Sequence, residues 1–228
     1  MKKKPSLPTF ANIVVALSLG ICAGASAQDA KPGDPVAGEK KAAMCNGCHS
    51  IPRYQGSFPE VYKVPMIAGQ NGKYIVTALT EYRKGDRKHP TMRGIAGSLS
   101  DQDMADLAAY YEQLGKSANA ASTPLPAEVT PPPQVAKLLA QANCASCHGA
   151  NYSKPIDASY PKHAGQHADY LYAALKSYQT DHNPLIGRNN AIMMGMARPF
   201  THPEIKAIAQ YLASLPGDLR TVEQPHFR

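Results

Sequence analysis

Apolar positions recur at helical spacing in two sets of three segments, and no stretch of the sequence shows the apolar–polar alternation of a strand. The expected helices are residues 35–44, 72–83 and 100–114 in the first set, and residues 135–143, 168–180 and 201–215 in the second. The apolar stripe is clearest in the last helix of each set, where it includes Leu107 and Ile208. The pattern therefore predicts an all-α fold.

Polar residues at the segment ends support these helix boundaries. Asp34 precedes Pro35, a pair typical of an N-cap followed by the first helical residue. Residues 100–103 (Ser-Asp-Gln-Asp) and 201–204 (Thr-His-Pro-Glu) resemble capping boxes, in which the first and fourth residues exchange hydrogen bonds. The last helix of each set is therefore expected to begin at these positions.

The two sets belong to an internal repeat. Residues 65–70 (Pro-Met-Ile-Ala-Gly-Gln) match residues 161–166 (Pro-Lys-His-Ala-Gly-Gln) at an offset of 96, which becomes 101 further along. The change places a five-residue insertion near residues 181–190, and insertions of this kind belong in loops.

The segment between the copies sets the domain boundaries. Residues 116–133 are rich in Ala, Ser and Pro, which predicts an exposed, partly extended connector rather than a helix. The predicted organisation is a signal peptide at 1–27, an N-terminal domain at 28–119, a Pro-rich linker at 120–133 and a C-terminal domain at 134–228.

The N-terminus is typical of an export signal. Three lysines precede an apolar run at residues 13–25, and Ala25-Ser26-Ala27 fits the cleavage pattern. The run is too short for a membrane-spanning helix, and no other segment is long and apolar enough to span a membrane. Cys22 is expected to leave with the peptide, since the bulky Ile21 disfavours lipid attachment there. We therefore expect a soluble periplasmic protein.

Charge adds little to this picture. The whole chain has a formal charge of +7, but residues 1–27 hold three lysines and no acidic residue, so their removal leaves +4. The remaining lysines and arginines are scattered rather than clustered, which excludes a nucleic-acid-binding footprint.

The four remaining cysteines lie in two copies of one five-residue motif. These are Cys45-Asn46-Gly47-Cys48-His49 and Cys144-Ala145-Ser146-Cys147-His148. Cys-x-x-Cys-His is typical of c-type haem attachment, in which two thiols bind the haem vinyl groups and the histidine ligates the iron. Disulfides, a thiol redox pair or zinc would each account for the cysteines but leave both adjoining histidines unexplained. The sequence predicts two covalently bound haem c groups.

Repeat positions also indicate a second iron ligand. Met92 is expected in a loop, and the cluster Met193-Met194-Gly195-Met196 occupies the same place in the second copy. Met92 and Met193 each stand seven residues before an apolar residue that starts the last-helix region. Met193 is preferred, with Met194 and Met196 as alternatives. His89 and His182 are rival ligands, and the other unmatched histidines are expected to be exposed.

These motifs resemble the dihaem cytochrome c4 family over residues 34–215. The resemblance implies two tandem class I cytochrome c domains related by a pseudo-twofold axis, each wrapped around a haem, with the haems near the interface. It implies His49 and Met92 on one iron, His148 and Met193 on the other, and Pro65 and Pro161 supporting the histidines. Residues 50–64 depart from the pattern, being three residues longer than their counterpart and lacking a glycine after His49.

The resemblance implies an electron carrier rather than an enzyme. It would pass electrons between respiratory partners, towards a terminal oxidase, and any membrane association would run through a partner oxidase or dehydrogenase. The alternatives are a cytochrome subunit of a dehydrogenase complex, and a haem peroxidase or thiosulfate oxidoreductase. The last class needs an open iron or a cysteine ligand, and no mature cysteine is spare. Two propionates on each haem would offset the charge of +4.

Overall fold

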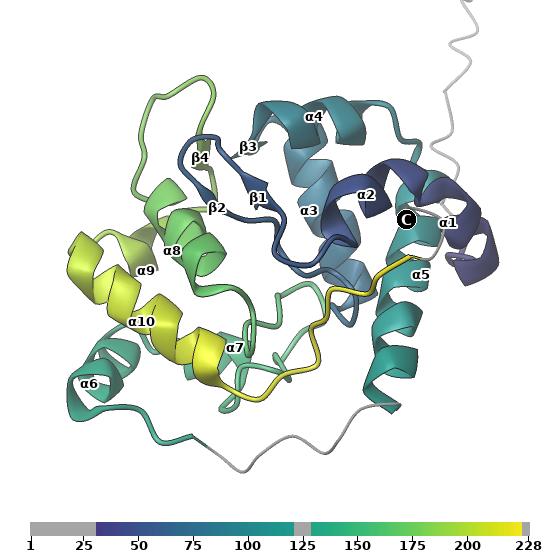
Figure 1. Ribbon diagram of the computed structural model, residues 1–228. Coiled ribbons are helices and arrows are strands. Elements are labelled where there is room, and N and C mark those ends of the chain that lie inside the picture. The colour runs from purple at the N-terminus through teal and green to yellow at the C-terminus, as the bar shows by residue number, and fades with distance from the viewer. Residues whose placement is uncertain (1–30, 121–128, 225–228) are drawn as a thin grey trace, which may run out of the picture.

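The computed structural model describes residues 31–120 and 129–224. The predicted signal peptide, Cys22, His226 and most of the predicted linker lie outside the described residues. Within the described ranges, no helix is long and apolar enough to cross a membrane. The secondary structure is mostly helical with little strand, as the apolar pattern predicted (Figure 1).

The first repeat begins with two short helices. Helix α1 spans Pro35–Lys41, and the Asp34 carboxylate caps it by accepting a hydrogen bond from the Val36 N–H at 2.9 Å. Helix α2 spans Ala43–His49 and carries the first Cys-x-x-Cys-His motif. The single helix expected at residues 35–44 is therefore wrong. Ala42, which is fully buried, lies between the two helices with a ψ of −4°.

Three further helices complete the first repeat. Helix α3 (Gly72–Lys84) confirms the middle-helix prediction and ends at Gly85, whose φ of 87° favours glycine. Helix α4 spans Pro90–Gly97 and helix α5 spans Asp101–Ala120. The prediction of a non-helical connector is wrong for residues 116–120. The sequence there lacks proline, and the Lys116–Glu112 ion pair at 3.0 Å extends the helix.

The second repeat follows the same order. Its helices are α6 (Pro133–Gln141), α7 (Ala145–His148), α8 (Ala168–Ser177), α9 (Ala191–Ala197) and α10 (His202–Ser214). The predicted capping box is present, with the Thr201 and Glu204 side chains and backbones exchanging hydrogen bonds. Helix α8 ends before residue 180 because Gln179 turns away and donates to the Phe200 carbonyl at 2.7 Å.

Four two-residue strands occur in the described part of the chain. Strands β1 (Gln55–Gly56) and β2 (Tyr62–Lys63) form a hairpin in the segment that departs from the family pattern. Strands β3 (Arg87–Lys88) and β4 (Gly187–Arg188) pair antiparallel and join the two repeats. The β3–β4 pair thus links the two repeats, whereas the β1–β2 hairpin lies within the first.

Each repeat has its own hydrophobic core, built on its last helix. The first core surrounds Met104 and Leu107 of α5, and the second surrounds Ile205 and Ile208 of α10. In Figure 1 the helices of the first repeat occupy the right of the view, and α8, α9 and α10 occupy the left. Two separate cores fit the prediction of two domains, although the exact boundaries stay a prediction.

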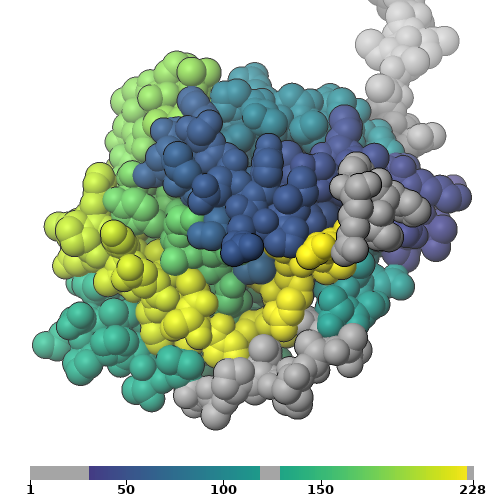
Figure 2. All heavy atoms as spheres, in the orientation of Figure 1, coloured from purple at the N-terminus to yellow at the C-terminus, as the bar shows by residue number. Residues whose placement is uncertain are grey.

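Ion pairs and the C-terminal segment hold the repeats together. Lys63 pairs with Asp169 at 3.0 Å, and Lys176 pairs with Glu60 at 2.9 Å, so the lengthened hairpin segment contacts α8. After α10 the chain crosses to the first repeat, where the N–H of Arg220 donates to the Ala68 carbonyl at 2.9 Å. Figure 2 shows this segment as a yellow band reaching the blue surface of the first repeat.

Candidate haem sites

The first cysteine of each motif lies at or near the start of a short helix. Cys45 and Cys48 lie on α2, and Cys144 immediately precedes α7, which carries Cys147. Cys45 packs against the first core and Cys144 against the second, and burial raises the pKa of both thiols. No cluster of three or more His, Cys, Asp or Glu side chains suited to a metal ion occurs among the described residues, which gives the zinc interpretation no support.

Each motif histidine is oriented by a proline carbonyl of its own repeat. The Nδ1 of His49 lies 2.8 Å from the Pro65 carbonyl oxygen, and the Nδ1 of His148 lies 3.3 Å from that of Pro161. A carbonyl only accepts, so each Nδ1 must carry the proton and Nε2 keeps its lone pair. Burial lowers the pKa of both imidazoles, which favours the neutral form that ligates iron.

A further histidine lies against the second of these imidazoles. The rings of His163 and His148 have centroids 4.3 Å apart, and the pKa of His163 lies well below its ordinary value because the ring is buried. The expectation that His163 is an exposed loop residue is therefore wrong. The repeat partner of His163 is Ile67, so this contact is particular to the second site.

The two matched methionines occupy equivalent helical positions. Met92 is the third residue of α4, and its N–H donates to the Nδ1 of His89 at 3.3 Å. Met193 is the third residue of α9, and its N–H donates to the side-chain oxygen of Asn190 at 3.1 Å. Met92 was expected in a loop. The helix starts before it because His89 caps the helix and Pro90 suits its first position.

The alternative ligands occupy less suitable places. Met196 is 41% exposed, and His182 is exposed in the lengthened loop of the second repeat. The Nδ1 of His89 already accepts the Met92 N–H. Met193 and Met194 are both half-buried, so burial does not separate them, and Met92 and Met193 stay predictions.

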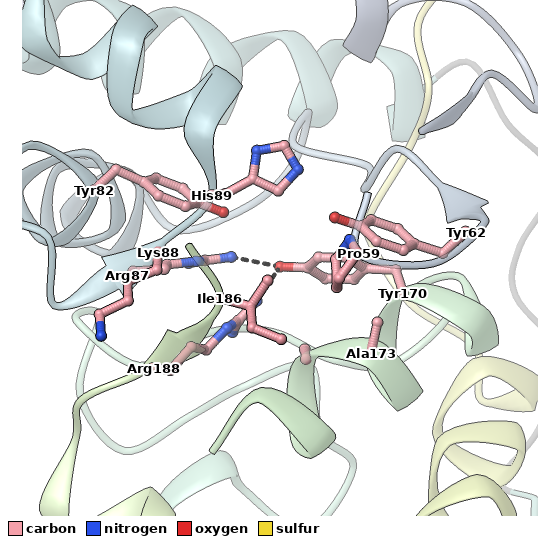
Figure 3. A pocket seen from close by; sticks show the side chains of 11 residues that line it. Pro59, Tyr62, Tyr82, Arg87, Lys88, His89, Tyr170, Ala173, Ile186 and Arg188 are labelled. Atoms are coloured by element: carbon pink, nitrogen blue, oxygen red, sulfur yellow. Dashed lines mark hydrogen bonds between the residues drawn. The ribbon is translucent and has the colours of Figure 1, made fainter. Parts of the chain in front are cut away.

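A cavity between the repeats holds two arginines without a carboxylate partner (Figure 3). Its lining includes Tyr62, Tyr82, Arg87, Tyr170 and Arg188. Arg87 is only 5% exposed and donates to the hydroxyl of Tyr170 at 2.6 Å, to which Arg188 also donates at 3.3 Å. Burial would raise the pKa of Tyr170, but the two guanidinium groups outweigh it and lower the pKa to about 8.

One buried atom in this cavity lacks a partner. The Nε of Arg87 makes no hydrogen bond, and no ion pair with an acidic residue of the described chain involves Arg87 or Arg188. An unsatisfied buried guanidinium nitrogen fits an anion, and haem brings carboxylates. Sequence reasoning missed these arginines, although both lie five residues before the matched methionines.

Comparisons with known proteins agree with this arrangement. The Cytochrome c family model matches residues 134–216. Cytochrome c4 from Azotobacter vinelandii is 31% identical over 213 residues, which cover 89% of this chain and 97% of that protein. A thiosulfate dehydrogenase electron acceptor from Stutzerimonas stutzeri (strain A1501) is 30% identical over 182 residues, covering 76% and 78%. The crystal structure of reduced recombinant cytochrome c4 from Pseudomonas stutzeri is 27% identical, with a TM-score of 0.57, covering 80% of this chain and 99% of that one.

Proposed function

The chain belongs to the cytochrome c4 family, and on that premise we propose which residues hold its haems and which partners it serves. It is a dihaem c-type cytochrome that transfers electrons. Each haem, when bound, supplies a one-electron iron couple. The chain's own residues attach the haem, supply the ligands of its iron and set the electrostatic surroundings of the haem.

The first haem is proposed to be held by Cys45 and Cys48, with His49 and Met92 as iron ligands. The observation that carries this proposal is the matched geometry of the two repeats. In each, a proline carbonyl holds the proton on Nδ1 of the motif histidine, and a capped helix presents a methionine at its third position. A methionine thioether favours reduced iron and raises the reduction potential.

The second haem is proposed to be held by Cys144 and Cys147, with His148 and Met193 as iron ligands. The guanidinium groups of Arg87 and Arg188 are proposed to hold haem propionates at the contact between the repeats. This proposal rests on the buried Nε of Arg87, which has no hydrogen-bond partner and could donate to an anion.

The proposed role is electron transfer without bond chemistry. If a histidine and a methionine ligate each iron, no coordination position would be open for a reacting molecule, which disfavours a peroxidase or thiosulfate oxidoreductase. We place the protein in the periplasm, carrying electrons towards a terminal oxidase. The alternative is an acceptor bound to a dehydrogenase, which the similarity to a thiosulfate dehydrogenase electron acceptor favours.

The test of this role uses the haem-loaded protein. The pre-reduced protein is mixed with respiratory membranes, and its oxidation is followed by visible absorption with and without cyanide. Cyanide-sensitive oxidation supports the oxidase route, whereas reduction by thiosulfate with its dehydrogenase supports the alternative. Rapid peroxide turnover by the purified protein would refute the carrier role. Capture of partners from membranes on the immobilised protein then identifies the donor and acceptor.

A further inference from the structure

One peptide group links the first motif histidine to the second repeat. The Pro65 carbonyl accepts the Nδ1 proton of His49 at 2.8 Å. The N–H of the same peptide group, on Met66, donates to the side-chain oxygen of Gln166 at 3.1 Å. The Gln166 amide nitrogen then donates to the Met66 carbonyl at 2.9 Å. A glutamine of the second repeat thus clamps the residue that follows the histidine's hydrogen-bond acceptor.

The same arrangement occurs in reverse. The Pro161 carbonyl accepts from His148, and the N–H of Lys162 donates to the side-chain oxygen of Gln70 at 2.9 Å. The Gln70 amide nitrogen donates to the Lys162 carbonyl at 3.1 Å. Gln70 and Gln166 are repeat partners, so the two repeats exchange glutamines across their interface.

Both glutamines are held in a single orientation. Gln70 is 4% exposed and Gln166 is 3% exposed. The oxygen of each also accepts the N–H of the next residue, Asn71 or His167, at 3.0 Å. Because two backbone N–H groups point at the oxygen and a carbonyl faces the nitrogen, the amide cannot be flipped without losing these bonds. Each neutral side chain is therefore held at the interface by three hydrogen bonds.

Hydrogen bonds joined through one peptide group strengthen each other. When the Met66 N–H donates to Gln166, the Pro65 carbonyl becomes a better acceptor for the His49 proton. A more strongly hydrogen-bonded Nδ1 makes the opposite nitrogen a more electron-rich iron ligand, which favours oxidised iron.

We propose that Gln70 and Gln166 are positioning residues that tune the haem of the opposite repeat. Gln166 lowers the reduction potential of the first haem through His49, and Gln70 does so for the second haem through His148. The inference rests on the proposed function, namely that these two histidines ligate iron. The reduction potential of each haem would then depend on how the two repeats pack against each other. The effect is larger at His49, whose bond of 2.8 Å is shorter than the 3.3 Å at His148.

The experiment exchanges each glutamine for methionine, which keeps the length but removes the amide. Asn71→Ala is the matched control, because it removes a neighbouring bond between the repeats, from the Asn71 side chain to the Tyr160 carbonyl at 3.1 Å. Two readouts are taken on the haem-loaded protein. One is the ¹H–¹⁵N NMR signal of each ligand histidine's Nδ1–H in the reduced state. The other is the midpoint of each haem, followed by NMR of haem methyl groups during a redox titration.

Each glutamine substitution is expected to affect the haem of the opposite repeat. Gln166→Met shifts the Nδ1–H signal of His49 towards weaker hydrogen bonding and lowers the oxidised-to-reduced ratio of the first haem by roughly two- to fivefold at a fixed potential. Gln70→Met does the same at His148 and the second haem, and Asn71→Ala changes neither.

Two outcomes would overturn the proposal. One is a shift in the haem of the mutated repeat itself, or equal shifts in both haems, which would indicate a general loosening of the interface. The other is no shift at either histidine. Failure of the proposed function is visible separately, since the unmutated protein would then lack iron-ligand histidine signals altogether.

Discussion

Arg87 and Arg188 lie opposite each other in the register of strands β3 and β4, and both guanidinium groups donate to one tyrosine hydroxyl. Like charges this close repel each other in a buried site, and a neutral phenol compensates them poorly. Their proximity therefore indicates an anion from outside the polypeptide. Haem propionates meet that requirement, and they would bring the acid groups of the cofactor to the contact between the repeats.

Replacing Arg87 with Gln should lower the reduction potential of the nearer haem. Loss of a buried positive charge stabilises oxidised iron by about 1 kcal/mol, equivalent to roughly a fivefold change in the oxidised-to-reduced ratio. If Arg87 binds a propionate, it would hold the pKa of that group low, and its removal would make the potential vary with pH near neutrality. Redox titration over a pH series measures both effects.

Lys84→Gln is the matched control, since it removes an exposed cation from the end of α3. It should leave the potential and its pH dependence almost unchanged, because solvent screens the charge. Equal effects of the two substitutions would contradict propionate binding by Arg87.

Replacing Met193 with Ala should remove the methionine–iron near-infrared band of one haem, which halves the band of the oxidised protein. The thioether is lost while the Asn190 cap to the backbone remains. Met194→Ala and Met196→Ala are neighbouring controls expected to keep the full band. Should Met194→Ala halve the band instead, the repeat alignment has selected the wrong sulfur.

Replacing Gly115 with Ala should destabilise the first repeat. An added Cβ would overlap the backbone of Gly69, and neither backbone can move without disturbing Gln70 beside it. The expected loss is roughly 1–3 kcal/mol in the free energy of unfolding, measured by chemical denaturation. Gly97→Ala is the control, because nothing lies within 4 Å of its added Cβ. Similar stabilities for the two variants would show that the close approach of Gly115 and Gly69 is not maintained in solution.

Acid should weaken the contact between α1 and α5. Lys41 and Ser100 hydrogen-bond the Asp103 carboxylate and hold its pKa at about 2, below its ordinary 3.8. A folded-state pKa below the unfolded value means that this contribution is complete above about pH 4 and is lost as the pH falls towards 2. Denaturation between pH 7 and 2 should therefore show a smaller acid loss for Asp103→Asn.

Asp101→Asn supplies the comparison for this prediction. The Asp101 carboxylate pairs with Arg83 at 2.6 Å, but its side chain is 70% exposed. Because solvent screens this pair, it contributes little to the free energy of unfolding. If Asp103→Asn and the unmutated protein lose stability in parallel on acidification, the pair with Lys41 does not contribute as proposed.

Local signals in the sequence predicted most of the helices and the cofactor. The Ser100–Asp103 and Thr201–Glu204 boxes marked true helix starts, because capping depends on residues three apart. The two motifs predicted haem for a similar reason, since a histidine directly follows each pair of cysteines. The break at Ala42 was missed because no glycine or proline marks it, and the complete burial of Ala42 is visible only in the structure.

What the sequence determined by itself is the set of features that depend on near neighbours: the all-α class, the repeat and the two haems. Only the tertiary structure decided how the repeats meet. Gln166 and Met66 are separated by 100 residues, and Arg87 reaches Tyr170 across 83. No periodicity or cap encodes such pairs, because their distances follow from how two complete cores pack together. The exchange of glutamines and the paired arginines could therefore be recognised only in three dimensions.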